Sequence, residues 1–105
     1  MINVVVMEGA ISLKPVLMEG RQGVVTEFNL EHSELSGPEP LRYVWRCKAK
    51  GKIATEIAER ALKGQLLTVQ GAMVQESVQH GDQTFAIVKL LVTECAFGRV
   101  KALSA

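Results

Sequence analysis

Hydrophobic and polar residues alternate in the middle of this chain, which is the pattern of strands that bury one face. Between residues 24 and 35, for example, Phe28 and Leu30 fall on one side, and Glu27, Asn29 and Glu31 fall on the other. Alternation predicts strands at Val24–Leu35 and Leu41–Lys50, and runs rich in apolar and β-branched residues predict strands at Met1–Ile11, Leu66–Val74 and Phe85–Cys95. Glycine, proline and short polar runs predict a bend at Lys14-Pro15, a turn at Gly20–Gly23, a loop at Ser36–Pro40 and a polar hairpin at Glu76–Gln83.

One segment departs from the two-residue period and predicts a helix, roughly Lys52–Leu62. Its apolar stripe at helical spacing consists of Ile53, Ile57, Ala58 and Ala61. Gly64 suits a left-handed helix cap, and Gly71 lies inside the next strand, where glycine indicates a bulge, a bend or a close backbone approach. A bent sheet plugged by one helix predicts the all-β class, as a five-stranded oligonucleotide-binding barrel, the OB-fold.

The strand before the helix carries the clearest candidate chemistry. Arg46, Lys48 and Lys50 alternate along it, so three cations share one face. No acidic residue occurs between Glu39 and Glu56, and the acids concentrate earlier in the chain. This face predicts a groove that follows a phosphate backbone, with a solvated surface as the alternative interpretation.

The first strand is apolar on both faces, which is typical of a strand covered on both sides. One face belongs to the barrel core, and a second copy of the chain is the simplest cover for the other. The residues assigned to this oligomer interface are Ile2, Val4, Val5, Val6 and Met7. The prediction favours a dimer over a tetramer.

Composition limits the classes of function. The 105 residues suit one domain, and a net charge of +1 means that any affinity for phosphate must come from local clustering. Cys47 and Cys95 belong to no metal-spaced motif and indicate free thiols in a cytoplasmic protein. No apolar run spans a membrane, and no catalytic or cofactor motif occurs, so we expect neither an enzyme nor a cofactor.

A family resemblance rests on the segment from Gly51 to Gly71, which reads GKIATEIAERALKGQLLTVQG. It resembles the signature of bacterial single-stranded DNA-binding proteins: Gly-Lys-hydrophobic-Ala, a helix, Lys-Gly, a strand and a closing glycine. Ile2-Asn3, Gly9 and Pro15 resemble the first strand of that family, and the run GDQTF at residues 81–85 resembles the turn into its last strand. The run EFNLEH at residues 27–32 resembles primosomal replication protein N (PriB), a short relative.

The resemblance covers about residues 2–95 and implies an OB-fold domain at residues 1–96 with a short tail at 97–105. It implies binding of single-stranded DNA in replication, recombination or replication restart, with replication or primosome proteins as further partners. The candidate nucleic-acid-binding residues are Arg21, Arg42, Tyr43, Trp45, Arg46, Lys48, Lys50, Lys52 and Lys89.

The aromatic residues leave one question open. Strict alternation places Tyr43 and Trp45 opposite Arg46, facing the core or a subunit, whereas the resemblance to PriB places Trp45 near DNA. The positions that match stacking aromatics of the larger family members hold Val44, Lys50 and Val78. Electrostatics should therefore carry more of the affinity. An RNA-binding barrel and a protein-interaction module remain the alternative functions.

Overall fold

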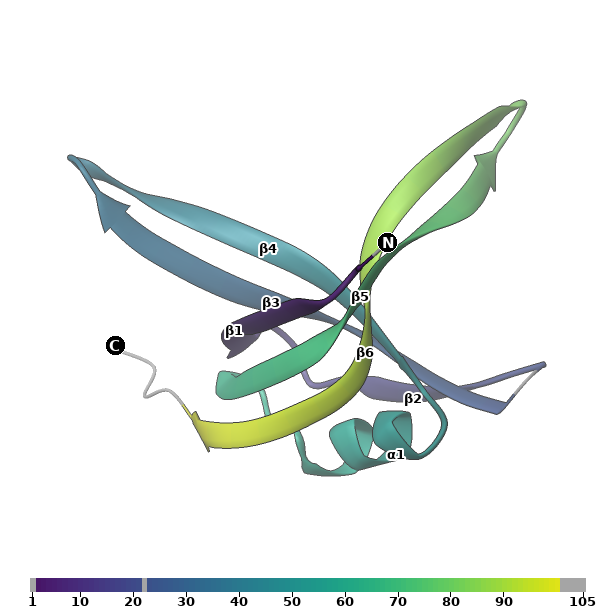
Figure 1. Cartoon of the computed structure of the whole chain (residues 1–105), viewed down its shortest axis with the longest axis horizontal. Coiled ribbons are helices and arrows are strands. Elements are labelled where there is room, and N and C mark those ends of the chain that lie inside the picture. Colours follow the sequence, from purple (N-terminus) through teal and green to yellow (C-terminus); the bar gives the residue numbers. More distant parts are fainter. Residues whose placement is uncertain (1, 22, 101–105) are drawn as a thin grey trace.

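In a computed structural model, which describes residues 2–21 and 23–100, one sheet closes into a barrel (Figure 1). The strands are β1 (Val5–Ile11), β2 (Val16–Gly20), β3 (Gly23–Ser36), β4 (Glu39–Lys50), β5 (Gln65–His80) and β6 (Gln83–Val100), and the helix is α1 (Gly51–Arg60). Their order in the sheet is β1-β5-β6-β4-β3-β2, and an additional β1–β3 pairing closes the barrel. Only β4 and β6 pair in parallel among the described strands. The predicted all-β OB-fold is confirmed.

The first strand of the predicted barrel is broken into β1 and β2 at the predicted bend. Ile11 pairs with Leu30 and Val16 pairs with Glu27, so five steps along the first strand face three steps along β3. The two extra residues are accommodated around Lys14 and the buried Pro15, where proline cannot donate to the ladder. β1 and β2 therefore serve as two halves of one bent strand.

Helix α1 plugs the barrel with the predicted stripe. Ile57 and Ala61 are fully buried, Ile53 packs against the core and Ala58 is half-buried. Ala54 is also fully buried, although the predicted stripe did not include it. The helix ends at Arg60 rather than at Leu62, and its C-cap is Ala61 in an extended conformation.

The predicted helix cap at Gly64 is therefore wrong. The Lys14 ammonium donates to the carbonyl oxygens of Ala58 and Ala61, each at 3.1 Å, and so satisfies the helix end. Gly64, at φ +83°, instead shapes the turn into β5, and its N–H donates to the Ile11 carbonyl at 2.7 Å.

The structure confirms the bulge and the close backbone approach predicted at Gly71. The β5–β6 register shifts between Gln70 and Gly71, and a side chain at Gly71 would overlap the backbone carbonyl of Leu91. The bulge lets β5 bend, so that its first half closes the barrel and its second half leaves it.

The strand ends differ from the sequence prediction because polar segments also pair. The expected loop at Ser36–Pro40 shrinks to a turn at Gly37-Pro38, and the polar hairpin continues β5 and β6 as far as the turn at Gly81-Asp82. β6 also extends to Val100, past the predicted end at Cys95. Backbone pairing needs no apolar side chains, so alternation in polarity underestimates these strands. Regular β1 pairing begins at Val5, and Met1 lies outside the described residues.

The two long hairpins, β3–β4 and β5–β6, diverge from the strand crossing as two arms, on the side of the barrel away from α1 (Figure 1). β4 and β6 pair only at Cys47 with Leu90 and at Lys48 with Leu91. Beyond these pairs the arms separate. At this junction β4 pairs with both β3 and β6, and β6 also pairs with β5. The positions of residues on its outer face therefore depend on all four strands.

Candidate nucleic-acid interface

The three cations of β4 lie on the outer face of the barrel, as their alternation predicts. Cys47 and Ala49, between them, are 1% and 0% exposed and belong to the core. Arg46 and Lys50 are exposed, whereas Lys48 is half-buried. A β-branched or apolar residue is not needed at the outward positions, because strand pairing and the inward residues already hold β4 in place.

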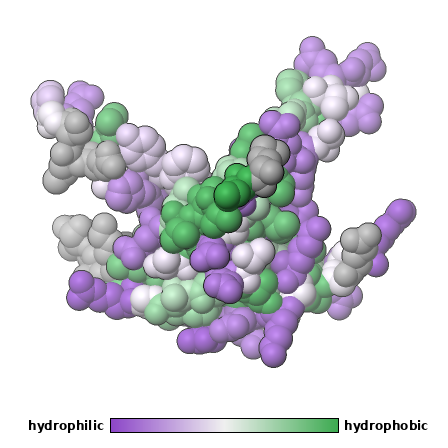
Figure 2. All heavy atoms as spheres, in the orientation of Figure 1, coloured by the Kyte–Doolittle hydropathy of each residue, from purple (hydrophilic) through white to green (hydrophobic). Residues whose placement is uncertain are grey.

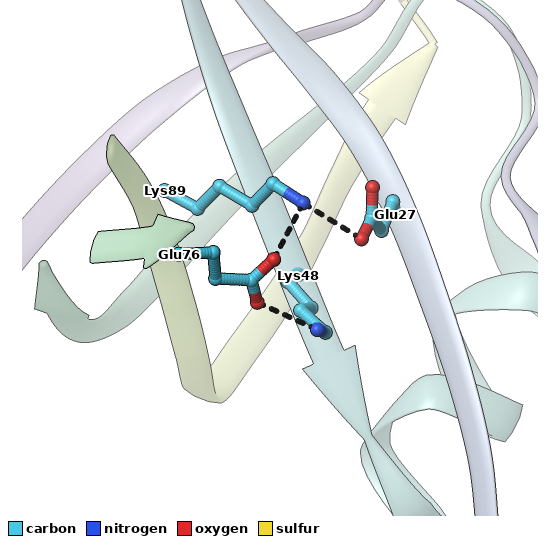
Figure 3. A network of polar contacts seen from close by, with 4 residues as sticks. All are labelled: Glu27, Lys48, Glu76 and Lys89. Carbon is cyan, nitrogen blue, oxygen red and sulfur yellow. Dashed lines mark hydrogen bonds and ion pairs between the residues drawn. The ribbon is translucent and has the colours of Figure 1, made fainter. Parts of the chain in front are cut away.

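Acidic side chains from neighbouring strands reach this face. The expectation of a surface with cations alone, which came from the sequence of β4, is therefore wrong. Glu27 on β3 lies directly opposite Lys48 in the register. Glu76 on β5 accepts a hydrogen bond from Lys48 at 2.6 Å through Oε1 and one from Lys89 at 3.0 Å through Oε2. The Lys89 ammonium also donates to Glu27 Oε1 at 2.9 Å. We call Glu27, Lys48, Glu76 and Lys89 the four-residue network (Figure 3).

The network shifts the pKa values of Glu76 and Lys89. Hydrogen bonds from Lys48 and then Lys89 lower the pKa of Glu76 from 4.5 to about 2, against a smaller effect of burial. Burial lowers the pKa of Lys89, but hydrogen bonds and charge attraction from Glu27 and Glu76 outweigh it, so the pKa is raised overall. The Glu76 carboxylate and the Lys89 ammonium are therefore both charged at neutral pH.

A groove of about 620 Å³ opens beside the network. It lies between the β1–β2 bend and the outer faces of β3, β4 and β6, and its polar lining includes Glu27, Asn29, Arg46 and Lys89. The β1–β2 bend contributes apolar side chains to the wall of this groove, among them Leu13. The groove thus combines an exposed guanidinium with an apolar wall, which are the two kinds of surface that a phosphate and a base need.

Tyr43 and Trp45 lie on the opposite face of β4, as strict alternation predicts. Trp45 pairs across the ladder with Leu30, a core residue, yet it is itself 38% exposed, because the arm has left the barrel at this point. It lines a second groove, of about 400 Å³, where the two arms separate. The Tyr43 ring stacks on His32 with 6.2 Å between ring centroids. Neither ring shares a face with Lys48.

The other candidate cations are spread around the barrel. Arg42, on the face of Arg46, pairs with Glu31, and this contact lowers the pKa of Glu31. Arg21 lies in the turn between β2 and β3, and Lys52 lies in the first turn of α1. The structure therefore gathers Arg46, Lys48 and Lys89 around one site and leaves Arg21 and Lys52 off the sheet face.

Sequence reasoning missed Phe85 on the β5–β6 arm. It pairs with Val78 and is 48% exposed. By alternation it shares the face of Ile87 and Lys89, so it supplies an aromatic surface on the side of the network. Its position just after the Gly81-Asp82 turn is the signal that could have indicated it, since such a turn fixes the hairpin register.

Within residues 2–21 and 23–100, no three His, Cys, Asp or Glu side chains gather as a metal site would require. None of the helices in the described part of the chain is long and apolar enough to cross a membrane. Cys47 and Cys95 are free thiols.

Comparison with known proteins supports the architecture. No family model and no curated protein matches the chain by sequence. Among solved structures, it is similar to the SSB of Plasmodium falciparum in complex with single-stranded DNA, with a TM-score of 0.81 and 18% identity, over 92% of this chain and 95% of that chain. The likeness establishes the OB-fold.

Proposed function

We propose that this protein binds single-stranded DNA on the outer face of β4 and in the adjoining groove, without catalysing a reaction. The observation that carries the proposal is exposed Arg46 in the lining of an open groove, with exposed Lys50 on the same face of β4. The barrel is that of a protein solved with single-stranded DNA. Arg46, Lys50 and Arg42 then hold successive phosphates, and Phe85 offers a ring for stacking a base.

The affinity is mainly electrostatic and little dependent on sequence. Aromatic residues are 5% of the chain, so few rings are available for stacking. Asn29 is the amide side chain in the lining of the groove, so little of the described groove surface can read base edges through amide hydrogen bonds. A role in DNA replication, recombination or replication restart follows from this activity and from the resemblance to PriB, and the two free thiols suit a reducing cytoplasm.

The test is an anisotropy titration with a labelled oligo-dT, an oligo-U and a DNA duplex of equal length, each at two salt concentrations. We expect the oligo-dT to bind more tightly than the duplex, with weaker binding at the higher salt concentration. Equal or tighter binding of the duplex contradicts the proposal. Preference for oligo-U would assign the groove to RNA, and no binding of any of the three would favour a protein-interaction module.

We further propose that two copies of the chain associate through the N-terminal strand. Val5 and Met7 pack against the core, but Ile2, Val4 and Val6 are 92%, 63% and 64% exposed. Figure 2 shows hydrophobic residues gathered over this part of the barrel, with hydrophilic residues toward the ends of the arms.

The backbone of β1 supports the same association. β1 pairs with β5 along Val5–Ala10 but with β3 only at Ala10 and Ile11, so within the described chain most of its second edge lacks a strand partner. An exposed apolar edge strand is a template for pairing with another copy. Val6→Lys should convert a dimer to a monomer in sedimentation at micromolar concentration, whereas Val88→Lys, on the β5–β6 arm, should not. A wild-type monomer contradicts this assembly.

A further inference from the structure

The carboxylate of Glu76 bridges two ammonium groups at the centre of the candidate interface. Each of its oxygens accepts from a different lysine, Oε1 from Lys48 at 2.6 Å and Oε2 from Lys89 at 3.0 Å (Figure 3). The three groups come from three strands, β4, β5 and β6. The bridge therefore depends on the tertiary fold and is not a local pairing along one strand.

The bridging anion has the chemistry of a phosphodiester. A backbone phosphate carries one negative charge and presents two unesterified oxygens, as a carboxylate does. Lysine binds phosphate as a compact point charge with rotatable donors, so it accepts either anion. A site that holds a carboxylate between two ammonium groups can hold a phosphodiester in the same place.

The exposures of the four side chains show which groups cover the others. The Lys48 and Lys89 side chains are 18% and 11% exposed, whereas those of Glu76 and Glu27 are 30% and 40% exposed. The acids are thus the more exposed groups, and the lysines lie beneath them. An anion from solvent that takes the place between the two ammonium groups must displace the Glu76 carboxylate, which bridges them.

We propose that Lys48 and Lys89 form a phosphodiester subsite that the Glu76 carboxylate occupies in the free protein, and that DNA binding exchanges this carboxylate for a backbone phosphate. The inference rests on the proposed function and assigns Glu76 as a built-in competitor of the ligand. It follows that the wild-type protein binds DNA more weakly than its cations alone would allow. Because Glu76 lies on β5 and Lys48 lies on β4, the exchange also removes the ion pair between these strands, while the backbone pairing of β4 with β6 remains.

The test compares Glu76→Gln with the wild-type full-length chain in oligo-dT titrations across a series of salt concentrations. Glutamine keeps the shape and removes the charge, so we expect affinity to rise about tenfold at low salt, the size of one or two partly exposed ion pairs. The slope of log affinity against log salt should stay near that of the wild type, because Lys48 and Lys89 neutralise the same phosphate in both proteins and only the competing carboxylate is lost. Glu59→Gln, an exposed acid on α1, is the matched control for the loss of one negative charge, and it should change affinity less than twofold.

A double-mutant comparison separates occupation of the subsite from a general change in charge. In a Lys48→Ala/Lys89→Met background, Glu76→Gln should no longer increase affinity, and a gain that persists there overturns the inference. Unchanged or weaker binding by Glu76→Gln, while wild type and Glu59→Gln bind, also overturns it and leaves the proposed function standing. Absence of binding by all variants overturns both. If Glu76→Gln does not fold, Glu76→Thr, which favours strands and carries no charge, provides the same comparison.

Discussion

Removal of the Glu76 charge should cost stability at neutral pH while it increases affinity for DNA. Glu76→Gln breaks the ion pairs to Lys48 and Lys89 and leaves Lys89, 9% exposed, with Glu27 as its remaining carboxylate partner. A buried ammonium that loses a partner loses part of the compensation for its desolvation. The variant should therefore unfold at a lower urea concentration than the wild type.

The magnitude follows from the pKa of Glu76. A carboxyl group whose pKa falls from 4.5 in the unfolded chain to about 2 in the folded protein stabilises the fold at neutral pH by at most about 3 kcal/mol. The side chain is 30% exposed, so solvent screening reduces the expected value to about 1–2 kcal/mol. This stability is fully present above the unfolded-state pKa and is lost as pH falls from 4.5 toward 2.

The assay is urea unfolding of wild type and Glu76→Gln at pH 7, 5, 4 and 3, followed by far-ultraviolet circular dichroism. The difference in free energy of unfolding should be constant between pH 7 and 5 and should shrink at pH 4 and pH 3, because the wild-type carboxyl group is protonated there upon unfolding. Glu59→Gln serves as the control. A difference that stays constant down to pH 3 would refute the assignment of the lowered pKa to the network.

Three further predictions concern the parts that hold the site in place. Gly71→Ala should destabilise the fold by about 3 kcal/mol in urea unfolding, because the new methyl group overlaps backbone atoms of Leu91; an effect no larger than that of Gly20→Ala would rule out the close approach. Lys14→Ala should lower stability by about 1 kcal/mol through the uncapped helix end, and Arg21→Ala, in an exposed turn, should not. Burial raises the pKa of Cys47 to about 12, so in a Cys95→Ser background a thiol reagent at pH 8 should react only after unfolding, and fast reaction of the folded protein would contradict its burial.

The position of Glu27, one of the two acids of the four-residue network, could have been predicted from the sequence. The turn at Gly37-Pro38 fixes the register of β3 and β4, and this register places Glu27 opposite Lys48. Polarity alone suggested a longer loop at Ser36–Pro40, which left the register undefined. If a two-residue turn had been predicted at Gly37-Pro38, the resulting register would have placed Glu27 opposite Lys48 from the sequence alone.

The position of Glu76 depends on features that no local pattern contains. It reaches Lys48 because the bulge at Gly71 bends β5 and because β4 and β6 meet in parallel over two residue pairs. Parallel pairing joins segments that are far apart in sequence, so no turn sets its register. The barrel, the helix plug and the cationic face could be predicted from periodicity, whereas the neutralisation of that face could not.

The salt dependence of oligo-dT binding tests the central claim most directly, with wild type compared with Arg46→Ala/Lys50→Ala. Both side chains are exposed on the outer face of β4, so their removal should leave stability nearly unchanged. If each holds one phosphate, affinity should fall and the slope of log affinity against log salt should become shallower by about 1.4, twice the value for one contact on a single strand. The control variant Lys63→Ala/Arg99→Ala removes two exposed cations elsewhere, and its slope should equal that of the wild type. An unchanged slope in Arg46→Ala/Lys50→Ala would show that single-stranded DNA does not bind along this face.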